Sequence, residues 1–473
     1  MKFYILILIV FFGLSVEAVE INKILPNGDV TIELIADTKF DFKPIFTIYQ
    51  GTEYINPNSL TDQQGVKPDS ISHKKYIFKL HHQEKSQYFS IVLQSNSHRY
   101  RIIDMFHFEP GDNVHIIVKE LNAGGGFQLE FSGRGAAKYE VRNKLSYRPI
   151  LSNKNEIESA LSLIEDYRTR LSDTSYDLLR ADAIGLIQEQ LFRNWFVELE
   201  DGIAKSKIEF NQAISKYPQA AKFDYHKLLS AKAMIKSKNY SQSLVIKISG
   251  ESFANLGKID YENCFNEIKK IENTSLRDKM VVVFFLRYWT KINKGYDKML
   301  NESISIVTDV RLLKKLKELK NNSAGLKAIN FQLPDVNGRI FTLNQFIGKV
   351  VFIDFWFTGC VHCSSYFKRH LNSVEKYFQD NKDVVFITIN VDMDKNLWIN
   401  SVNSGEYTSK DVINLNTNGE GVNHEFTKYY NVYTFPKPML IGKDGHIFKF
   451  AGNEMRKADN LMREINNALA SNR

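Results

Sequence analysis

A short stretch, residues 350–363, constrains the fold of this chain more than any other part, and it reads VVFIDFWFTGCVHC. Its first residues are β-branched or aromatic, which predicts a buried central strand over residues 350–356. A helix is expected to begin at Cys360, so that Cys360 and Cys363 lie at a helix N-terminus. Unpaired backbone N–H groups and the helix dipole favour a thiolate at such a position. The stretch therefore predicts the chemistry of thiol–disulfide exchange.

The length and composition indicate a soluble protein with more than one domain. A chain of 473 residues is too long for one ordinary core, so two or three domains are expected. Apolar residues make up 43% and charged residues 25%, which is typical of soluble globular proteins. The formal net charge of +8 is modest for this length, so we expect no nucleic-acid partner.

The N-terminus has the pattern of a signal peptide. Lys2 supplies a positive charge, residues 3–14 are apolar, and small residues precede a cleavage point after residue 18. The apolar run is shorter than the ~20 residues of a membrane-spanning helix, and an uncleaved anchor stays the alternative. No cysteine follows the cleavage point, which excludes a lipid-modified N-terminal cysteine. We expect removal of residues 1–18, no transmembrane span in the remainder, and export to the periplasm, with attachment to a membrane or the outer envelope left open.

Three regions follow the signal peptide, and they predict a multidomain fold class. Residues 19–136 hold short strand-like segments separated by turn signals, which predicts a β-sandwich-like, β-rich domain. Residues 137–322 carry apolar side chains at a helical period, which predicts a central all-α domain. After a linker-like cluster, strands and helices alternate over residues 326–473, which predicts an α/β domain.

The chain holds three cysteines, and we expect only two of them to be reactive. Three cysteines do not make a disulfide framework in an exported protein of this length. Cys264 is interpreted as a small buried hydrophobic residue. Cys360 is the predicted nucleophile, because attack on a substrate disulfide requires a stabilised thiolate. Cys363, one helical turn further on and more buried by its position, is the predicted resolving thiol.

Two further side chains beside the cysteines are candidates for roles in the reaction. Asp354 interrupts an apolar strand, where an acid is costly unless it is paired or useful, and it is the predicted acceptor of the Cys363 proton. The alternative is an Asp at a strand end that caps nearby backbone. His362 can place a positive charge close to the Cys360 sulfur. The alternative for His362 is a solvated surface side chain with little effect.

A zinc site is the rival use of a CxxC pair. Structural zinc normally takes four ligands, commonly a second CxxC or two histidines at short spacing. Only Cys264 remains as a third thiol, and His362 and His370 do not make that pattern. We therefore expect no metal and no cofactor other than the redox-active disulfide of Cys360 and Cys363.

Pro436 precedes the last predicted strand pair and follows Phe435. A cis peptide bond between them would expose the backbone of Phe435, and an extended substrate could then add as a strand edge. A proline before a strand is usually a plain turn when it is taken alone. The combination with a CxxC pair favours the cis form.

The region from about residue 326 to the end resembles the thioredoxin fold, and more narrowly the exported TlpA-type thiol–disulfide oxidoreductases of bacteria. The resemblance rests on an opening hairpin at 328–338, a buried acid and aromatic, the cysteine pair, a proline and a final turn: Asp354, Phe355, Trp356, Cys360, Cys363, Pro436 and Lys443-Asp444-Gly445. It implies that Trp356 is an active-site aromatic. It further implies a substrate groove formed by Trp356, His362, Phe435 and Pro436.

A weaker resemblance covers the first two regions. Pro110-Gly111-Asp112, followed by residues 131–136, is similar to the N-terminal extension of long TlpA-like proteins from bacterial periplasms. This resemblance implies a module for binding or assembly, without an activity of its own.

Three positions depart from the family pattern. Gly359 stands where many members have Trp, residues 364–368 lack the usual glutamate and proline, and Phe435 replaces a small or β-branched residue. The dipeptide between the cysteines is similar to the Pro-His of strongly oxidising members. These departures concern the substrate and the redox direction.

The resemblance implies an exported enzyme that reduces protein disulfides and receives electrons from a thiol protein. A disulfide oxidase or isomerase is the alternative, because of His362. A peroxidase of the peroxiredoxin kind is disfavoured, because Phe357 and Asp354 stand where those enzymes carry Thr and Pro. A different alternative is a partner-binding protein with an auxiliary redox domain.

Overall fold

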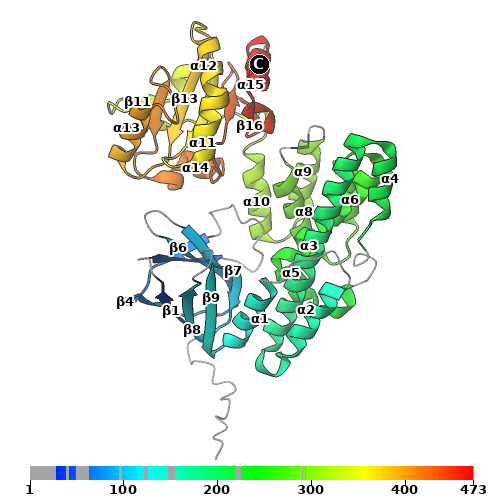
Figure 1. The fold of residues 1–473 in the computed structure, drawn as a ribbon. Helices are drawn as coiled ribbons and strands as arrows, with labels where there is room; N and C mark the ends of the chain where they lie inside the picture. Colours follow the sequence, from blue (N-terminus) through cyan, green and yellow to red (C-terminus); the bar gives the residue numbers. More distant parts are fainter. Residues whose placement is uncertain are drawn as a thin grey trace, which may run out of the picture. The chain divides into compact units, whose positions relative to one another are not determined.

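A computed structural model describes residues 28–38, 42–49, 63–94, 99–121, 126–146, 155–218, 225–289, 291–292 and 295–471. The predicted signal peptide, residues 1–18, lies outside these ranges. The described residues divide into one compact unit, which lies within residues 1–46 and 65–140, and a second unit, which lies within residues 47–64 and 141–473 (Figure 1). The predicted domain boundaries at residues 136 and 322 stay predictions.

The β-rich region forms two sheets in the described residues. The five-stranded sheet has the order β4 (Ser70–Ser72), β5 (Lys75–Leu80), β1 (Val30–Asp37), β8 (Asn113–Glu120) and β9 (Phe127–Arg134). The four-stranded sheet has the order β3 (Gln63–Val66), β2 (Lys43–Tyr49), β6 (Gln87–Gln94) and β7 (Arg99–Phe108). β1 and β8 pair in parallel, whereas β5 and β9 pair with them in antiparallel fashion.

Aromatic rings connect the two sheets of this region. Phe46 on β2 stacks on Phe78 of β5, with ring centroids 4.9 Å apart, and on Phe89 of β6 at 5.1 Å. Alternate residues of β1 are buried, as expected for strands with one face against a core. The core of this region is therefore built from the inward-facing positions of both sheets.

A buried ion pair ties the turn before β8 to helix α1 (Ala136–Ser146). The Lys138 ammonium lies 2.6 Å from a carboxylate oxygen of Asp112, and both side chains are about 5% exposed or less. The Tyr139 hydroxyl donates to the other Asp112 oxygen at 3.1 Å. At Gly135, where φ is +89°, a Cβ would lie 2.2 Å from the Asp112 carboxylate, so the turn accepts only glycine. The Pro-Gly-Asp turn and the Gly-Arg-Gly segment thus form one structural motif.

The region that follows is helical in the described residues. Its longer helices are α2 (Asn155–Glu165), α3 (Asp173–Lys205), α4 (Lys207–Ser215), α5 (Ala231–Lys236), α6 (Lys238–Leu256), α7 (Tyr261–Lys269), α8 (Thr274–Tyr288), α9 (Tyr296–Ile306) and α10 (Val310–Lys320). Most of them begin at a side chain that accepts from a backbone N–H of the first turn, namely Ser172, Ser206, Ser230, Ser237, Asp260, Asn273 and Asp309. These caps fix the starts of the helices that carry them.

The C-terminal region is built around a five-stranded sheet with the order β14 (Ile413–Asn416), β13 (Val384–Asn390), β12 (Val350–Trp356), β15 (Met439–Ile441) and β16 (Ile447–Phe450). β12, β13 and β14 are parallel, and β15 and β16 form the predicted antiparallel hairpin. A short hairpin, β10 (Gln332–Pro334) and β11 (Ile340–Thr342), precedes the sheet. This arrangement confirms the α/β fold predicted for the end of the chain.

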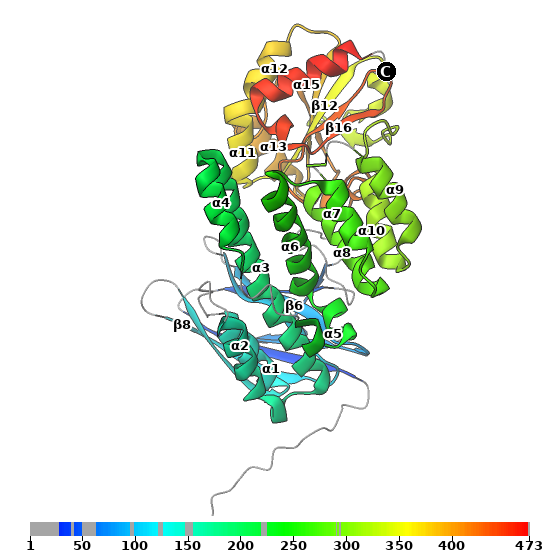
Figure 2. The same ribbon diagram turned by 90° about the vertical axis from the view of Figure 1, so that its right-hand side faces the viewer.

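Helices cover both faces of this sheet. One face carries α11 (Val361–Tyr366), a π-helical turn (Phe367–Leu371), α12 (Asn372–Phe378) and α15 (Ala458–Ala470), and Figure 2 shows α12 and α15 side by side. The other face packs against α14 (Glu425–Tyr429) and the β10–β11 hairpin, while α13 (Lys395–Ser404) contributes to the cluster around the cysteines. All seven residues of β12 are buried, as the sequence predicts for a central strand.

The buried ion pair of the β-rich region leads to a stability prediction. Replacing Lys138 with Met leaves the Asp112 carboxylate buried without its cation, which costs about 3–5 kcal/mol. The free energy of opening of β8 and β9, measured by hydrogen exchange of the full chain, should fall by that order. The matched control is Lys119→Met, which breaks the exposed Lys119–Glu130 pair and should cost about 1 kcal/mol or less. Equal effects of the two substitutions would contradict a structural role for the buried pair.

Candidate active site

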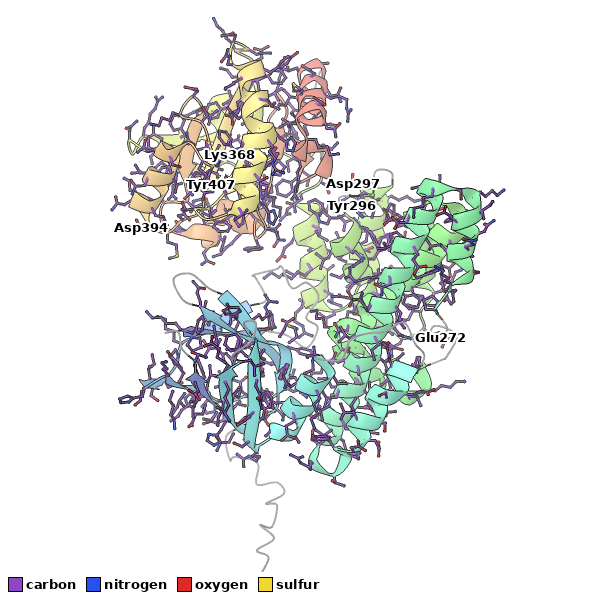
Figure 3. All side chains as sticks on the ribbon, in the orientation of Figure 1. Glu272, Tyr296, Asp297, Lys368, Asp394 and Tyr407 are labelled. Atoms are coloured by element: carbon purple, nitrogen blue, oxygen red, sulfur yellow. A yellow bond between two sulfur atoms is a disulfide. The ribbon has the colours of Figure 1, made fainter. Side chains whose placement is uncertain are left out.

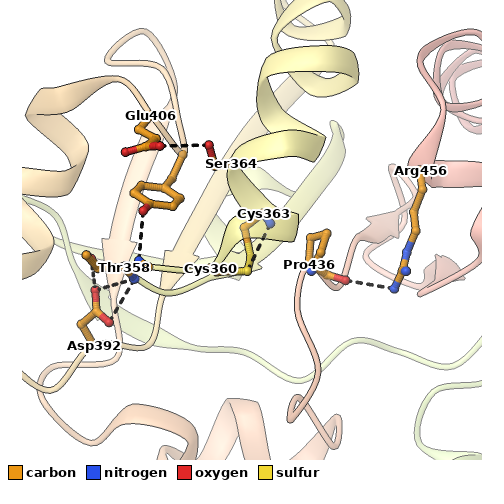
Figure 4. The surroundings of a disulfide bond; sticks show 10 residues. Thr358, Cys360, Cys363, Ser364, Asp392, Glu406, Pro436 and Arg456 are labelled. Carbon is orange, nitrogen blue, oxygen red and sulfur yellow. Dashed lines mark hydrogen bonds between the residues drawn. A yellow bond between two sulfur atoms is a disulfide. The ribbon is translucent and has the colours of Figure 1, made fainter. Parts of the chain in front are cut away.

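The candidate cysteines follow the carboxyl end of β12, the central strand of the sheet. Cys360 is the N-cap of α11, with φ −76° and ψ 95°, and its sulfur accepts from the backbone N–H of Cys363 at 3.1 Å. The two cysteines form a disulfide. The helix therefore begins where the sequence predicts, and its first turn points a backbone donor at the Cys360 sulfur (Figure 4).

The two cysteines differ in exposure. Cys360 keeps 6% of its surface and Cys363 only 1%, so Cys360 is the outer residue of the pair. Both pack in an apolar cluster with Trp356, Trp398 and Tyr407. Apolar surroundings disfavour the charged thiolate, in opposition to the helix terminus.

The loop between β12 and α11 is held by a residue from the end of the neighbouring strand. The Thr358 backbone N–H and hydroxyl both donate to the Asp392 carboxylate, the hydroxyl at 2.6 Å. Ser401 of α13 shares a hydrogen bond with the same hydroxyl at 2.7 Å. Asp392 was not singled out from the sequence, because nothing near residue 392 marks it as a partner of the cysteine loop.

Gly359 takes a backbone conformation that would be strained for Trp, the residue that many members of the family carry at this position. Its φ is +88°, and its N–H donates to the Tyr407 hydroxyl at 3.0 Å. The Tyr407 ring stacks on Trp356, with centroids 5.1 Å apart and planes 8° from parallel. Trp356 is fully buried and packs in one cluster with both cysteines, so it does not present a surface to a substrate. Tyr407, placed in Figure 3, is a supporting residue that sequence reasoning missed.

The Phe435–Pro436 peptide bond is cis, in agreement with the prediction. Figure 4 shows Pro436 beside the disulfide. The Phe435 ring meets the edge of the partly exposed Phe357 ring at 5.3 Å. The exposed Arg456 donates to the Pro436 carbonyl oxygen at 3.1 Å, which brings a cation from the segment before α15 to the site. No local pattern in the sequence marks Arg456 as part of the site.

Asp354 lies in the middle of β12, on the face that α11, α12 and α15 cover. Its side chain is 1% exposed, and its Oδ1 atom has no hydrogen-bond partner among the described residues. Burial raises the pKa of Asp354 from 3.8 to about 8, against the opposing effects of the Phe355 N–H, the Arg456 charge and the Lys437 N–H. With this pKa, Asp354 is protonated at neutral pH in the oxidised protein.

His362 is exposed at the start of α11. This position agrees with the solvated alternative considered from the sequence, and it also leaves the imidazole accessible to an incoming protein. Further along the same helical run, Ser364 and Lys368 both contact a carboxylate oxygen of Glu406, each at 3.2 Å. Figure 3 places Lys368 on the ribbon of this region. These contacts link α11 to the segment that carries Tyr407.

Neither a metal site nor a membrane span is seen in the part of the chain that the structure describes. No group of three or more His, Cys, Asp or Glu side chains there is arranged to hold a metal ion. No helix within those ranges is long and apolar enough to cross a membrane. Cys264 is buried in the helical core, and burial raises the pKa of its thiol to about 11.

Sequence comparisons find relatives of the C-terminal region. Residues 348–447 match a family described as thioredoxin-like. The thiol-disulfide oxidoreductase ResA of Bacillus thuringiensis is 29% identical over 133 residues, which are 28% of this chain and 72% of that protein. ResA of Bacillus subtilis is 29% identical over 136 residues, or 29% of this chain and 71% of that protein.

Solved structures also resemble this region. The thioredoxin domain of a thiol-disulfide oxidoreductase from Bacteroides vulgatus is 21% identical, with a TM-score of 0.27, and covers 31% of this chain and 96% of that domain. A thiol-disulfide oxidoreductase from Bacteroides fragilis is 20% identical, with a TM-score of 0.25, and covers 29% of this chain and 98% of that one. The sequence matches confirm the resemblance to TlpA-like proteins of the thioredoxin superfamily.

The raised pKa of Asp354 predicts how stability depends on pH. An acid whose folded-state pKa lies near 8 and whose usual value is 3.8 contributes stability that is present below about pH 4 and is lost as the pH rises through 8. Asp354→Asn removes this dependence. As the pH rises from 5 to 9, the free energy of unfolding of the variant should therefore increase by about 2 kcal/mol or more relative to that of the unmodified protein.

Hydrogen exchange of β12 as a function of urea concentration, at pH 5 and at pH 9, measures this difference in stability. The exposed Asp380 supplies the control, since Asp380→Asn should leave the pH dependence unchanged. A pH dependence that Asp354→Asn leaves intact would show that this carboxyl is not the buried titrating group.

Proposed function

We propose that this chain, whose C-terminal domain is a TlpA-like thiol–disulfide oxidoreductase of the thioredoxin superfamily, works as a protein-disulfide reductase. The observation that carries the direction is the apolar cluster around both sulfurs, formed with Trp356, Trp398 and Tyr407. An environment that disfavours the thiolate destabilises the reduced pair, which lowers the reduction potential. A protein with a low potential gives electrons to substrate disulfides.

The reaction needs two exchanges of a disulfide bond. The Cys360 thiolate attacks a substrate disulfide, so that one substrate sulfur leaves with the electron pair and takes up a proton. Cys363 then loses its proton to Asp354 and attacks Cys360, which releases the second substrate sulfur and closes the Cys360–Cys363 disulfide. A thiol protein that supplies electrons must reopen this bond. In that step the leaving Cys363 sulfur takes the proton that Asp354 holds.

The substrate side of the site is formed by three exposed or partly exposed residues, Phe357, His362 and Phe435, together with the buried Pro436. Phe357 and Phe435 offer apolar surface close to Cys360, and Pro436 lies beside the disulfide (Figure 4). His362 lies exposed within the CxxC pair. An extended substrate segment could pair with the backbone of Phe435 as an added strand edge.

A disulfide oxidase or isomerase is the second candidate, and His362 is the observation that favours it. A positive charge on this imidazole would stabilise the Cys360 thiolate and raise the potential. The exposure of His362 weakens this effect, because water screens the charge.

The remaining assignments are part of the same proposal. We infer that residues 1–18 are a signal peptide and that the protein is exported, with the periplasm as its compartment. The β-rich region, with a β-sandwich arrangement, and the all-α region would then hold a partner, such as the electron-donating thiol protein. A partner-binding protein with an auxiliary redox domain differs from this proposal in not needing Cys360.

Cysteine variants test the function directly. Cys360→Ala should lower the rate of insulin-disulfide reduction by about 10³-fold or more, because no other thiol in the pair reaches the substrate. Cys363→Ala should trap a mixed disulfide between Cys360 and the substrate, seen as a covalent complex on a non-reducing gel. Cys264→Ala is the matched control and should keep full activity, since its thiol is buried. Turnover that survives in Cys360→Ala would overturn the proposal.

A further inference from the structure

A second carboxyl lies buried in the layer of helices that covers Asp354. Glu375, on α12, is 7% exposed, and neither of its carboxylate oxygens has a hydrogen-bond partner among the described residues. Its helical neighbours Val374 and Phe378 pack in the same cluster as Val350 and Phe352 of β12. These two β12 residues point to the same face as Asp354, because side chains alternate along a strand. The two acids therefore occupy one apolar layer.

The electrostatic effects of the two acids on their surroundings agree with this placement. Burial raises the pKa of Glu375 to about 8, and the charges of Asp354 and Asp411 act in the same direction. Tyr366, on α11, has its pKa raised by burial and by the charges of Asp354 and Glu375. The helix α15 lies against α12, and its charged residues are Asp459, Arg463 and Glu464. Glu464 is paired with Lys449 at 3.3 Å.

Asp411 extends this arrangement to the surface. It precedes β14, whose first residue Ile413 pairs with Ile387, which in turn pairs with Ile353 of β12. Asp411 thus lies toward the amino ends of the parallel strands, whereas the disulfide lies beyond their carboxyl ends. Asp411 is exposed, whereas Glu375 and Asp354 are both buried, Asp354 more completely.

We propose that Glu375 is a positioning residue for the redox reaction, which shares a proton with Asp354 and exchanges it with solvent near Asp411. The inference rests on the thiol–disulfide exchange proposed above. It explains why an unpaired acid is kept at a buried helical position, where it costs stability unless it has a use. A substrate protein that covers the disulfide would not block this route.

The proton balance of the route is simple. When a thiol donor attacks Cys360, the electron pair leaves on the Cys363 sulfur, the O–H bond of Asp354 breaks and an S–H bond forms. The proton of Glu375 then restores Asp354, and Glu375 takes a proton from water at the surface. Each step runs in reverse while Cys363 attacks the mixed disulfide with the substrate. The Arg456 charge and the Lys437 backbone N–H both lower the pKa of Asp354, and they do so in whichever direction the proton moves.

Infrared titration of the oxidised full chain tests the proposal. The C=O bands of protonated carboxyl groups at pH 7 should include one from Asp354 and one from Glu375 in the unmodified protein, and Glu375→Gln should lose the second. The single ionisation midpoint in the variant should lie about one pH unit below the higher of the two midpoints of the unmodified protein, because the like-charge repulsion between the two carboxylates is gone. The rate at which dithiothreitol opens the disulfide, corrected for its thiolate fraction, should change its pH profile by the same shift. The exposed Glu425 supplies the control, since Glu425→Gln should alter neither readout.

Two outcomes would overturn the proposal. One is a midpoint in Glu375→Gln that equals the higher midpoint of the unmodified protein, since a merely structural Glu375 would change stability without moving this titration. The other, decisive if Glu375→Gln does not fold, is an unchanged titration in Asp411→Asn, a surface variant that should lower the higher midpoint by a smaller amount. Glu375→Asp should retain both carboxyl bands. Because these readouts use the oxidised protein, they stay informative even where insulin reduction fails.

Discussion

The redox centre depends on the burial of β12 between two layers of side chains. Alternate residues of this strand pack in two different hydrophobic clusters. Val351 and Ile353 lie on one face, and Val350 and Phe352 lie on the other. Asp354 falls on the second face, so an acid lies in the apolar layer that α11, α12 and α15 cover. The same strand ends where α11 begins, and this junction fixes Cys360 as the outer sulfur. The position of one strand thus sets the positions of both the proposed nucleophile, Cys360, and the acid that we propose exchanges a proton with Cys363.

The elements that follow from local sequence patterns could be predicted. The bounds of β12, the start of the helix at Cys360, the β15–β16 hairpin and the cis bond before Pro436 all rest on a few adjacent residues. The chemistry of the cysteine pair was predicted for the same reason. What the pattern could not establish is the state of Asp354, because its proton depends on how completely distant segments exclude water from it.

Residues that act from distant segments were missed. Asp392 binds Thr358 from 34 residues away in the chain, and Tyr407 binds Gly359 from 48 residues away. No local motif in the sequence predicts such partners. Glu375 was missed for a different reason. The π-helical turn at Phe367–Leu371 inserts an extra residue into the helix, so the inward face cannot be extrapolated from Cys363 with a period of 3.6 residues. A charged residue on such a helix is normally expected at the surface.

The central claim is that the Cys360–Cys363 pair gives electrons to substrate disulfides, and the reduction potential of the pair tests it most directly. Equilibration of the full chain with glutathione buffers at pH 7, followed by tryptophan fluorescence or by thiol labelling, measures this potential. The apolar surroundings of both sulfurs predict a value near or below about −250 mV, toward the thioredoxin end of the known range. A value above about −150 mV would contradict the claim and make the protein a donor of disulfides, with His362 the first residue to replace.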